Sequence, residues 1–552
     1  MSHRILSFNL IAILFVHSTS FGSAYDEAKE NAAMAREALI RSRHTLHAYL
    51  DRRDPVTGLL PRSGQHPAWY VRDSAADLYP FLVLAARFVE PSVYENEMHE
   101  ILRREIQQST RLGWLSDNVA AGGGFEDPEI DLDRLIFGSS EYAKDGLLPL
   151  SERLGRTAWL DRMVHITDDI LSHAPYETRF GKIPSLGSEV NGEMLQVLTR
   201  LAYLTHDPRY IDQAITITRF YFEEVIPKSN GLPPQTWNLE EEKPELGYFN
   251  LADHGNEIVG GLSEFVLFLK EEDHPLYPAM AKSLSELVNL ILDVGRNEDG
   301  VWVLRVSCED YEVTDPRHAH CWGYLFNGVY TAYLVTGEER FRDALKFALK
   351  SVKEKPTYLD DPQGSGRGYG SNAYSDAIES AIVFLNRFPD EELFEVLDRC
   401  VDRFLQRQRE DGIIEDWYGD GNYVRTALMY AFMKSQGVWI EPWREDVQLG
   451  AAMEGDSLVL ALNSENPWEG KVRFDIPRHR EFFNMPINYP RLNEFPEWFT
   501  VNGDSLYQIE VDGNHEVRCG GELIEGFNLR TDGKDWTELR VEEMPGPPYS
   551  RP

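Results

Sequence analysis

The sequence predicts a mainly α-helical protein in which helix hairpins form two concentric rings, an (α/α)6 or (α/α)7 toroid, followed by a small antiparallel β domain. Three observations predict this fold. A pair of helices joined by a short polar turn recurs at intervals of roughly 50 to 65 residues, which is typical of helical repeats. One helix of each pair is apolar nearly all round, as a buried helix is, whereas the other has a single apolar stripe. After Gly437 the helical period ends.

The first 24 residues have the features of a secretory signal peptide. Arg4 carries their only charge, residues 5–16 form an apolar core, and Gly22-Ser23-Ala24 offers a cleavage site between small residues. The apolar run is shorter than the roughly 20 residues that a transmembrane helix needs. We therefore expect an exported protein, secreted or periplasmic, without a membrane anchor.

The helix pairs follow in order along the chain. The clearest turns between paired helices lie at 154–160, 204–210 and 335–341, where a polar turn is followed by an aromatic residue or Leu. We expect the inner, apolar helices at 70–89, 139–154, 187–205, 254–270, 319–336, 371–387 and 421–436. We expect the outer, amphipathic helices at 27–51, 93–111, 157–173, 208–227, 276–295, 339–354 and 390–408. Seven pairs fit best, and a terminal pair outside the ring would leave six.

Short alternating or apolar runs then replace the helices, at 458–462, 471–476, 506–511 and 538–541. Asn, Gly and Pro separate them, which is the pattern of an antiparallel β domain. The predicted organisation is a signal peptide at 1–24, a toroid at 25–440, and a β-sandwich-like domain with a tail at 441–552. We expect the β domain to brace the toroid.

Composition limits the class of partner. Hydrophobic residues make up 42% of the 552 residues and aromatic residues 12%, which is enough for a large core. The formal net charge of −36 argues against nucleic acid or an anionic membrane as a partner, because both require a basic surface. The oligomeric state is left open by the sequence.

The four cysteines are too few for a disulfide scaffold, although export would permit bridges. Cys308 and Cys321 flank one loop. Free thiols are favoured over a bridge between them, because spacing alone does not establish the geometry of a disulfide. Cys400 and Cys519 are expected to be buried thiols.

With its helix-pair repeat over residues 27–440 and its acidic and aromatic inner-helix starts, the chain resembles the α/α-toroid carbohydrate-active enzymes. That broad group contains six- and seven-hairpin glycosidases, polysaccharide lyases and sugar epimerases. The resemblance implies an enzyme that acts on a poly- or oligosaccharide, and a β module after the toroid is common in the group. No motif assigns the chain to one family within it.

In a toroid, the loops that enter the inner helices converge at one end of the central cavity, where a concave site would form. The alternative role of a carboxylate in a first helical turn is to cap the helix, and aromatics there often belong to the core. The candidate catalytic residues at these starts are Asp73, Glu189, Glu193, His254, Glu257, His320, Tyr324 and Asp376. The candidate substrate-binding residues are Trp69, Arg72, Asn191, Trp322, Tyr374, Trp417 and Arg425.

Glycoside hydrolysis is the favoured activity. It needs an acid that protonates the leaving oxygen and a second carboxylate that acts as base or nucleophile. We expect Asp73 and Glu189 first in these roles, without assigning one role to each. The carboxylates able to supply the pair are Asp73, Glu189, Glu193, Glu257 and Asp376, and the aromatics able to stack on sugar rings are Trp69, Trp322, Tyr374 and Trp417.

Three alternatives remain open. A lyase acting on a uronate-containing glycan needs a base and groups that neutralise the carboxylate. A sugar epimerase needs two acid/base groups, and His254-x-x-Glu257 resembles the His-x-x-Glu element of the N-acylglucosamine epimerase group. A glycan-binding protein is the non-enzymatic alternative. The residues that would serve a lyase are Asn191, His254, His320, Tyr324 and Arg425.

Metal and cofactor signals are weak, and none is expected. His318-x-His320 lacks a spaced partner pair, and residues 416–422 do not match a calcium loop. The glycine-rich stretch 364–370 has neither the preceding strand nor the Gly-Lys-Ser/Thr of a phosphate loop. We expect it to be a mobile loop over the cavity.

Overall fold

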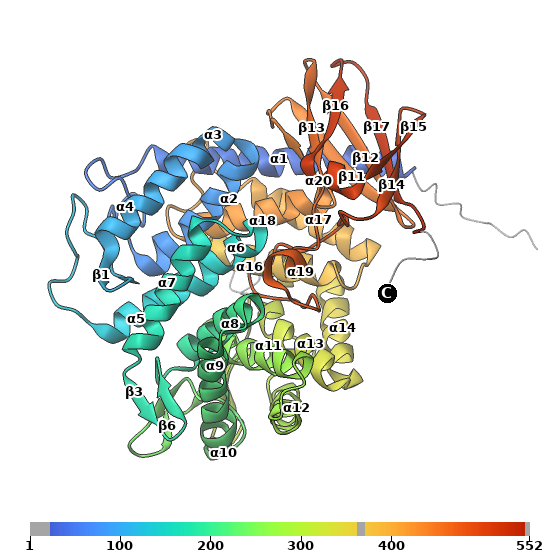
Figure 1. Ribbon diagram of the computed structural model, residues 1–552. Helices are drawn as coiled ribbons and strands as arrows, with labels where there is room; N and C mark the ends of the chain where they lie inside the picture. The colour runs from blue at the N-terminus through green and yellow to red at the C-terminus, as the bar shows by residue number, and fades with distance from the viewer. Residues whose placement is uncertain (1–22, 361–369, 547–552) are drawn as a thin grey trace, which may run out of the picture.

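The computed structural model describes residues 23–360 and 370–546, and it is mostly helical with small antiparallel sheets (Figure 1). Each inner helix packs against the next, and the last packs against the first, so that the inner helices close a ring. In order, they are η1 (Val71–Leu78, π-helical) continued by α2 (Tyr79–Val89), α5 (Leu132–Glu141) continued by η3 (Tyr142–Leu147, π-helical) and α6 (Leu148–Leu154), α8 (Ser188–Thr205), α11 (Glu257–Glu271), α13 (Trp322–Thr336), α16 (Ser371–Leu385) and α18 (Gly419–Lys434).

The outer helices surround this ring and bury one face each. Asp207 and Asp390 accept hydrogen bonds from the first turns of α9 and α17, so the polar turns that mark the repeat are helix N-caps. The outer elements are α1 (Ala24–Leu50), α3 (Pro91–Val93) with η2 (Tyr94–Met98) and α4 (His99–Ser109), α7 (Ala158–His173), α9 (Pro208–Phe220) with η4 (Tyr221–Val225) and α10 (Ile226–Lys228), α12 (Tyr277–Val294), α14 (Glu339–Glu354), α15 (Thr357–Asp360) and α17 (Glu391–Leu405).

The connections from outer to inner helices contain short strands that the sequence analysis did not predict. The second inner helix also begins at Leu132, seven residues before its expected start at 139, because the Asp131 side chain caps it. The strands are β1 (Thr110–Leu112), β2 (Leu115–Ser116), β3 (Tyr176–Thr178), β4 (Gly181–Ile183), β5 (Thr236–Asn238), β6 (Lys243–Leu246), β7 (Tyr248–Asn250), β8 (Val303–Ser307) and β9 (Val313–His318).

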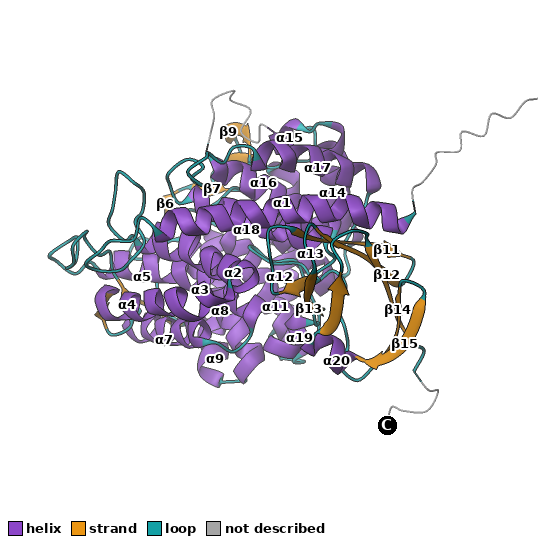
Figure 2. Cartoon of the chain, turned by 90° about the horizontal axis from the view of Figure 1, so that it is seen from above, coloured by secondary structure: helices purple, strands orange, loops and turns teal. Residues whose placement is uncertain are grey.

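Beyond the helices, two antiparallel sheets pack on one side of the ring, next to α1 (Figure 2). Three of the four predicted strand segments lie within strands of these sheets, whereas the segment 471–476 runs three residues past a strand that ends at Arg473. The three-stranded sheet has the order β10 (Trp439–Glu441), β13 (Trp468–Arg473), β16 (Phe527–Thr531). The five-stranded sheet has the order β11 (Val447–Glu454), β12 (Ser457–Ser464), β17 (Thr537–Glu543), β14 (Leu506–Val511), β15 (Asn514–Cys519), and α20 (Gly520–Glu525) follows β15.

Between β13 and β14 the chain leaves the sheets and returns to the helical ring. Figure 1 shows α19 (Arg478–Phe483) among the helices, away from the sheets. Residues 484–498, which we call the plug, follow it. The buried plug residue Arg491 pairs with Glu152 at 2.9 Å, and Glu494 pairs with Arg387 at 2.9 Å. The plug therefore closes the end of the ring where the inner helices finish.

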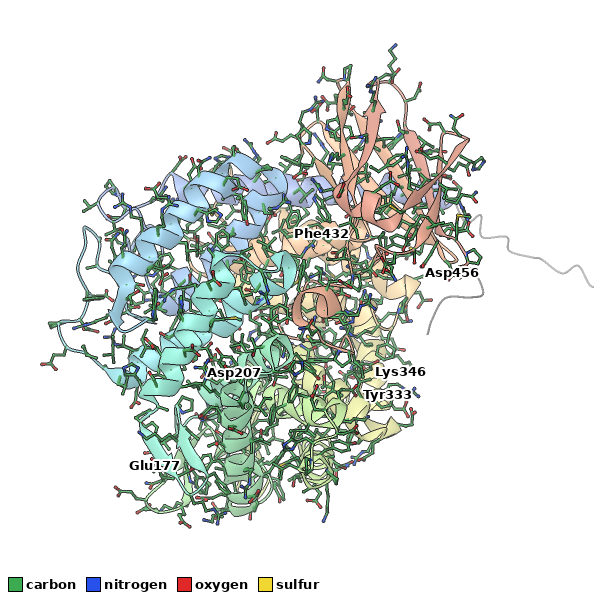
Figure 3. All side chains as sticks on the ribbon, viewed as in Figure 1. Glu177, Asp207, Tyr333, Lys346, Phe432 and Asp456 are labelled. Carbon is green, nitrogen blue, oxygen red and sulfur yellow. The ribbon has the colours of Figure 1, made fainter. Side chains whose placement is uncertain are left out.

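The helices and sheets share an apolar junction. Phe432 of α18, labelled in Figure 3, lies at this junction, with its ring centroid 4.7 Å from that of Phe88. The Arg153 guanidinium lies 4.6 Å from the same Phe432 ring. In the described ranges, no helix has both the length and the apolar character needed to cross a membrane.

All four cysteines lie in the described part of the chain, and each is a free thiol. The less favoured bridge between Cys308 and Cys321 is therefore not formed, and Cys321 Sγ instead accepts a hydrogen bond from the Asp253 N–H at 3.2 Å. Cys400 is buried as expected, whereas Cys519 is only partly buried. Residues 1–22 of the expected signal peptide (1–24) and residues 364–369 of the glycine-rich stretch (364–370) lie outside the described residues.

Candidate active site

The starts of the inner helices surround a polar cavity of about 240 Å³, which we call the pit. Of the described residues that line it, nine are Asp or Glu, whereas three are Arg and one is His. The pit brings together seven of the eight predicted catalytic residues, the exception being His320. Its lining residues are Arg62, Arg72, Asp73, Asp77, Glu141, Asp145, Glu189, Glu193, Asp253, His254, Glu257, Tyr324, Asn372, Asp376, Tyr418, Asn422, Arg425, Leu492 and Asn493.

Two of the inner helices enter the pit as π-helical turns, η1 and η3. Such turns are rare and frequently occur at functional sites. Asp73 and Asp77 come from η1, and Asp145 comes from η3. Asp73 forms an ion pair with Arg62, and Asp145 pairs with Lys144 at 2.7 Å. Asp73 and Asp145 therefore already have cationic partners, whereas burial raises the pKa of Asp77 well above its usual value.

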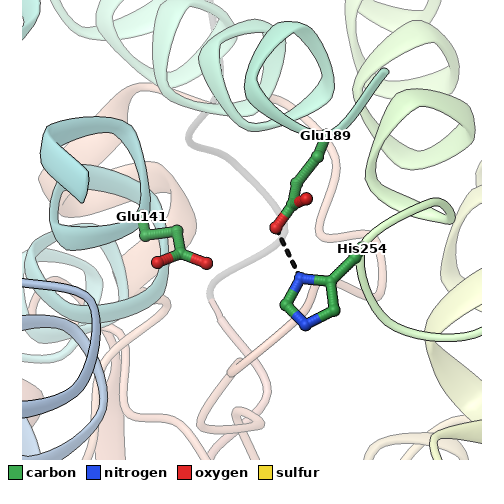
Figure 4. A group of neighbouring side chains, drawn as sticks. All are labelled: Glu141, Glu189 and His254. Atoms are coloured by element: carbon green, nitrogen blue, oxygen red, sulfur yellow. Dashed lines mark hydrogen bonds and ion pairs between the residues drawn. The ribbon is translucent and has the colours of Figure 1, made fainter. Parts of the chain in front are cut away.

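Glu141, Glu189 and His254 meet at one side of the pit, from three separate elements (Figure 4). His254 Nδ1 lies 2.5 Å from Glu189 Oε1. Arg72 holds Glu141 through two hydrogen bonds, of 2.7 and 3.0 Å. The negative charge of Asp253, and then the bond to Glu189, raise the pKa of His254 well above its usual value despite partial burial. The imidazole is therefore positively charged at neutral pH and donates to Glu189.

Two other carboxyl groups of the pit hold their protons more tightly than usual. Burial raises the pKa of Glu257 to about 8, although Lys144 opposes the shift. Its Oε2 atom has no hydrogen-bond partner among the described residues. Burial also raises the pKa of Glu193 well above its usual value, and Ser140 Oγ donates to it at 2.6 Å. These two groups are therefore able to carry a proton near neutral pH.

A second cluster lies on the opposite helices, around Asp376 of α16. The Tyr324 hydroxyl donates to Asp376 at 2.7 Å and to Glu379 at 2.9 Å. Arg425 pairs with Asp376 at 2.8 Å, and His320 Nε2 lies 3.3 Å from the same carboxylate. Burial would raise the pKa of Asp376, but His320 and Arg425 outweigh it and lower that pKa. Asp376 is therefore the ionised centre of this cluster.

Two wider grooves open from the pit. The first, of about 680 Å³, shares Arg72 and Glu189 with the pit and is lined by Tyr70 and Tyr176. The second, of about 900 Å³, shares His254 with the pit and contains Trp417 and the predicted His320. The pit and the grooves therefore form a trough across the mouth of the ring, wide enough for an extended ligand.

Not every predicted binding residue lies on this trough. Arg72 and Arg425 line the pit and Trp417 lines the second groove. Trp69 and Trp322 are 1% and 0% exposed, so neither ring can stack on a sugar, because each fills the core between helices. The expected stacking role is wrong for both.

Asn191 and Tyr374 also have structural surroundings. Asn191 is buried, and its amide donates to the carbonyls of Ser185 and Gly187 at 2.7 Å each, which fixes the start of α8. Tyr374 packs against the core and has the Arg407 guanidinium 4.6 Å from its ring centre. Neither residue lines the pit or either groove.

The sequence analysis did not select several pit residues. Asp77 follows the candidate Asp73 by one helical turn, and Glu141 and Asp145 are spaced by one turn from each other. This spacing places side chains on one face and was available as a signal. Asn493 lies in the plug, far along the chain, and no sequence pattern indicates its place in the pit.

The residues around Glu141 also offer a spacing suited to a metal ion. One ligand atom from each of Glu141, Glu189 and His254 lies within 4.8 Å of the others. Two of these groups are engaged with each other, and Arg72 neutralises the third. A metal would have to displace these interactions, so the arrangement suits proton transfer better than metal binding.

No protein-family model and no curated protein matches the chain. Among solved structures, it is similar to a cellobiose 2-epimerase from Spirochaeta thermophila at 16% identity, covering 68% of this chain and 99% of that chain, with a TM-score of 0.43. An α-1,6-mannanase from Salegentibacter has 14% identity, coverage of 59% and 95%, and a TM-score of 0.42. An unsaturated glucuronyl hydrolase from Bacillus has 13% identity, coverage of 57% and 87%, and a TM-score of 0.38. These structural neighbours are carbohydrate-active enzymes, the broad group that the sequence resembles, and they identify no specific family.

Proposed function

We propose that the chain is an exported glycoside hydrolase that acts on a neutral poly- or oligosaccharide and is built on a toroid of seven helix pairs at 25–440 with a β domain at 441–552. One observation carries the activity. Glu257, a proton-bearing carboxyl group, and Glu189, a hydrogen-bond-accepting carboxylate, line one pit at the centre of an open trough. A glycosidase needs this combination of acid and carboxylate.

Glu257 is the proposed general acid. Its pKa of about 8 keeps it protonated at neutral pH, and its Oε2 atom has no partner among the described residues to compete for the proton. A carboxyl group raised in this way can protonate the leaving oxygen. Burial also raises the pKa of Asp73, which we expected first in this pair, but its ion pair with Arg62 opposes the rise. Glu257, with a pKa of about 8, is therefore the preferred proton donor.

Glu189 is the proposed base or nucleophile. It lies at the first turn of α8, where the helix dipole favours a negative charge, and it accepts a hydrogen bond from His254. The neighbouring Glu141 is neutralised by Arg72. The excess of carboxylates in the pit also suits the positive charge that develops on the sugar ring in an oxocarbenium-like transition state.

The charge of the pit argues against the lyase alternative. Even with Glu193 and Glu257 protonated, a uronate would meet seven further acidic side chains and cations that already have partners. Burial also raises the pKa of Tyr324 well above its usual value, and its hydroxyl donates to two carboxylates, so it is a poor base. A neutral sugar avoids this repulsion.

The test uses purified protein and a panel of neutral and uronate-rich glycans, followed by new reducing ends and by the ultraviolet absorbance of unsaturated uronates. We expect reducing ends without absorbance. Glu257→Gln should lose about 10²–10⁴-fold in kcat/KM on natural glycans but little on aryl glycosides, whose leaving group needs no acid. Glu189→Gln should lose activity on both classes of substrate.

A matched control is Glu177→Gln, since Glu177 is an exposed Glu on β3 outside the trough (Figure 3). It should keep full activity. Equal losses in Glu257→Gln on both substrate classes would contradict the role of Glu257 as the acid. Absence of turnover with every glycan, together with measurable binding, would support the glycan-binding alternative instead.

A sugar epimerase is the second candidate, because His254 and His320 both line the second groove and each lies beside a carboxylate. Two such acid/base groups can remove and return a proton on opposite faces of a ring. Incubation in D₂O separates the two activities, because an epimerase incorporates deuterium on carbon and releases no new reducing end.

A further inference from the structure

The plug contributes Leu492 and Asn493 to the lining of the pit, and it contacts helices that precede it by 68 residues or more. We infer that Asn493 of the plug is a positioning residue that fixes Arg425 against Asp376 and Glu379 and so completes the active site. Only the kinetic test of this inference rests on the proposed function. Four observations carry it.

First, the plug is held rigidly on both sides of Asn493. Arg491 pairs with Glu152 at 2.9 Å, and Glu494 pairs with Arg387 at 2.9 and 3.0 Å. All four side chains are buried or nearly so. Buried, hydrogen-bonded ion pairs of this kind tolerate little displacement, because losing one partner leaves an uncompensated charge.

Second, the backbone at Asn493 has φ of +58°, a left-handed conformation that Asn adopts more readily than most residues. In this conformation its N–H points at α16 and donates to Glu379 Oε1 at 2.7 Å. The plug backbone thus contributes a donor directly to a carboxyl group of the second cluster.

Third, the Asn493 side chain bridges two inner helices. Its Oδ1 accepts from Arg425 Nη1 of α18 at 2.8 Å, and its Nδ2 donates to the Asp145 carbonyl of η3 at 2.9 Å. Asn422 is the other acceptor of Arg425 Nη1, at 3.1 Å. Asn493 is 1% exposed and lines the pit.

Fourth, these bonds direct the other end of Arg425. Its Nη2 faces Asp376 at 2.8 Å and Glu379 at 2.9 Å. Asp376 is also the partner of His320. The protonation of the second cluster is therefore linked, through Arg425, to Asn493. The C-terminal part of the chain thus does more than brace the ring.

The test compares two identical substitutions in the full-length protein. Asn493→Gly keeps the left-handed backbone and the N–H donor but removes both side-chain bonds. Asn484→Gly is the matched control, because Asn484 also has a positive φ, of +57°, lies in the same plug, and has a side chain that donates to the carbonyls of Tyr203 and Leu204 instead of to a pit residue. Asn493→Asp is a second variant that retains an acceptor for Arg425, in case Asn493→Gly fails to fold.

With a glycan that the wild type hydrolyses, Asn493→Gly should lower kcat by about tenfold or more with a smaller change in KM, whereas Asn484→Gly should stay near the wild type. Asn493→Asp should recover part of the loss. The pH profile of kcat should shift in Asn493→Gly, which a merely structural role would not produce. Unchanged kcat and pH profile in a folded Asn493→Gly would overturn the inference.

A second readout needs no turnover. The NMR titration of His320, assigned with His320→Gln, reports the charge balance around Asp376, while Asp253 and His254 near it stay unchanged in both variants. Release of Arg425 should raise the pKa of His320 in Asn493→Gly and not in Asn484→Gly. If no glycan is hydrolysed, the proposed function fails, and this titration alone decides the role of Asn493. Identical titration midpoints of His320 in the wild type and in Asn493→Gly would then contradict the inference.

Discussion

At the scale of single residues, the mouth of the pit depends on how Arg62 is held. Its guanidinium lies 4.3 Å from the ring centre of Tyr70 and 4.2 Å from that of Trp417, and it forms an ion pair with Asp73. Trp417 thus uses one ring face for a cation. Its contribution to binding is therefore partly indirect, through the position of Arg62 between the pit and the first groove.

This arrangement predicts a difference between two substitutions of Trp417. Trp417→Ala removes the cation–π contact and should lower kcat/KM by about tenfold, or about 1.4 kcal/mol, within the range of such contacts. Trp417→Phe keeps an aromatic face and should lose much less. Steady-state kinetics on one glycan checks both variants, and equal losses would show that Arg62 does not depend on the ring.

The sequence was a better guide to which residues have the chemical groups for catalysis than to which side chains are exposed in the cavity. Asp73, Glu189 and Glu257 were recognised because carboxylates at helix starts are polar residues in an otherwise apolar context. Trp69 and Trp322 occupy similar positions in sequence, yet they face the neighbouring helices. A residue type at a helix start does not indicate which way its side chain points, since one residue of shift turns it by about 100°.

At the scale of elements, glycines set the distance between α8 and α11, which carry Glu189 and Glu257. A Cβ on Gly192 would lie 2.3 Å from the Glu257 carbonyl carbon, and a Cβ on Gly261 would lie 2.5 Å from the Gly192 oxygen. The two backbones therefore touch. This close crossing brings the proposed acid and the proposed base to one cavity.

The crossing predicts that Gly192→Ala forces the two helices apart. We expect a loss of about 2 kcal/mol or more in the free energy of unfolding, as for an overpacked core, together with loss of activity. The matched control is Gly260→Ala on α11, where the nearest atom to a new Cβ is Gln196 Nε2 at 3.8 Å. It should be neutral or slightly stabilising, because Ala favours a helix over Gly. Chemical denaturation measures both, and an unaffected Gly192→Ala would contradict a backbone contact.

Helix periodicity and turn chemistry were sufficient to predict most helices of the ring. The local sequence specifies where α8 ends and where α9 begins. The apolar run of α8 stops at a polar turn, Asp207 caps the next helix, and Pro208 is the first residue of α9. The strands at the mouth, of two to six residues each, were missed because such short segments carry little or no period. Their conformation depends on pairing partners elsewhere in the chain.

At the scale of the whole molecule, contacts between distant segments complete the site, and these lay beyond sequence reasoning. The plug at 484–498 meets helices that precede it by more than a hundred residues. Nothing local in Asn493 or Arg491 specifies such a contact. The place that the plug occupies exists only once the inner helices have formed a ring. One end of that ring is then open, and a loop from the sheets can fill it.

The buried carboxyl groups also affect the stability of the whole protein. Burial raises the pKa of Glu257 to about 8 and that of Glu379 to about 7. The folded protein therefore binds more protons than the unfolded chain, whose glutamates titrate near about 4.3. Stability must fall as pH rises through the interval between these values, because the unfolded state loses its protons first.

Other buried carboxylates have the opposite effect at lower pH. Arg491 and Arg200 overcome the effect of burial and lower the pKa of Glu152, and His320 and Arg425 do the same for Asp376. The stability that these groups contribute is complete above the unfolded pKa near about 4 and is lost as pH falls through their folded pKa values. The two effects together place maximum stability at mildly acidic pH.

We therefore expect the melting temperature to be highest near about pH 5, to fall towards pH 8, and to fall again below about pH 4. Thermal unfolding at constant ionic strength measures this curve. Glu257→Gln cannot titrate and should flatten the descent between pH 5 and 8, whereas the exposed control Glu177→Gln should not. The net charge of −36 also disfavours folding at high pH, but salt screens repulsion between exposed charges and not the cost of burying a carboxylate. The fall in melting temperature between pH 5 and 8 could instead disappear in high salt or be equally steep in Glu257→Gln. Either result would show that repulsion between surface charges, and not the buried Glu257, causes the fall.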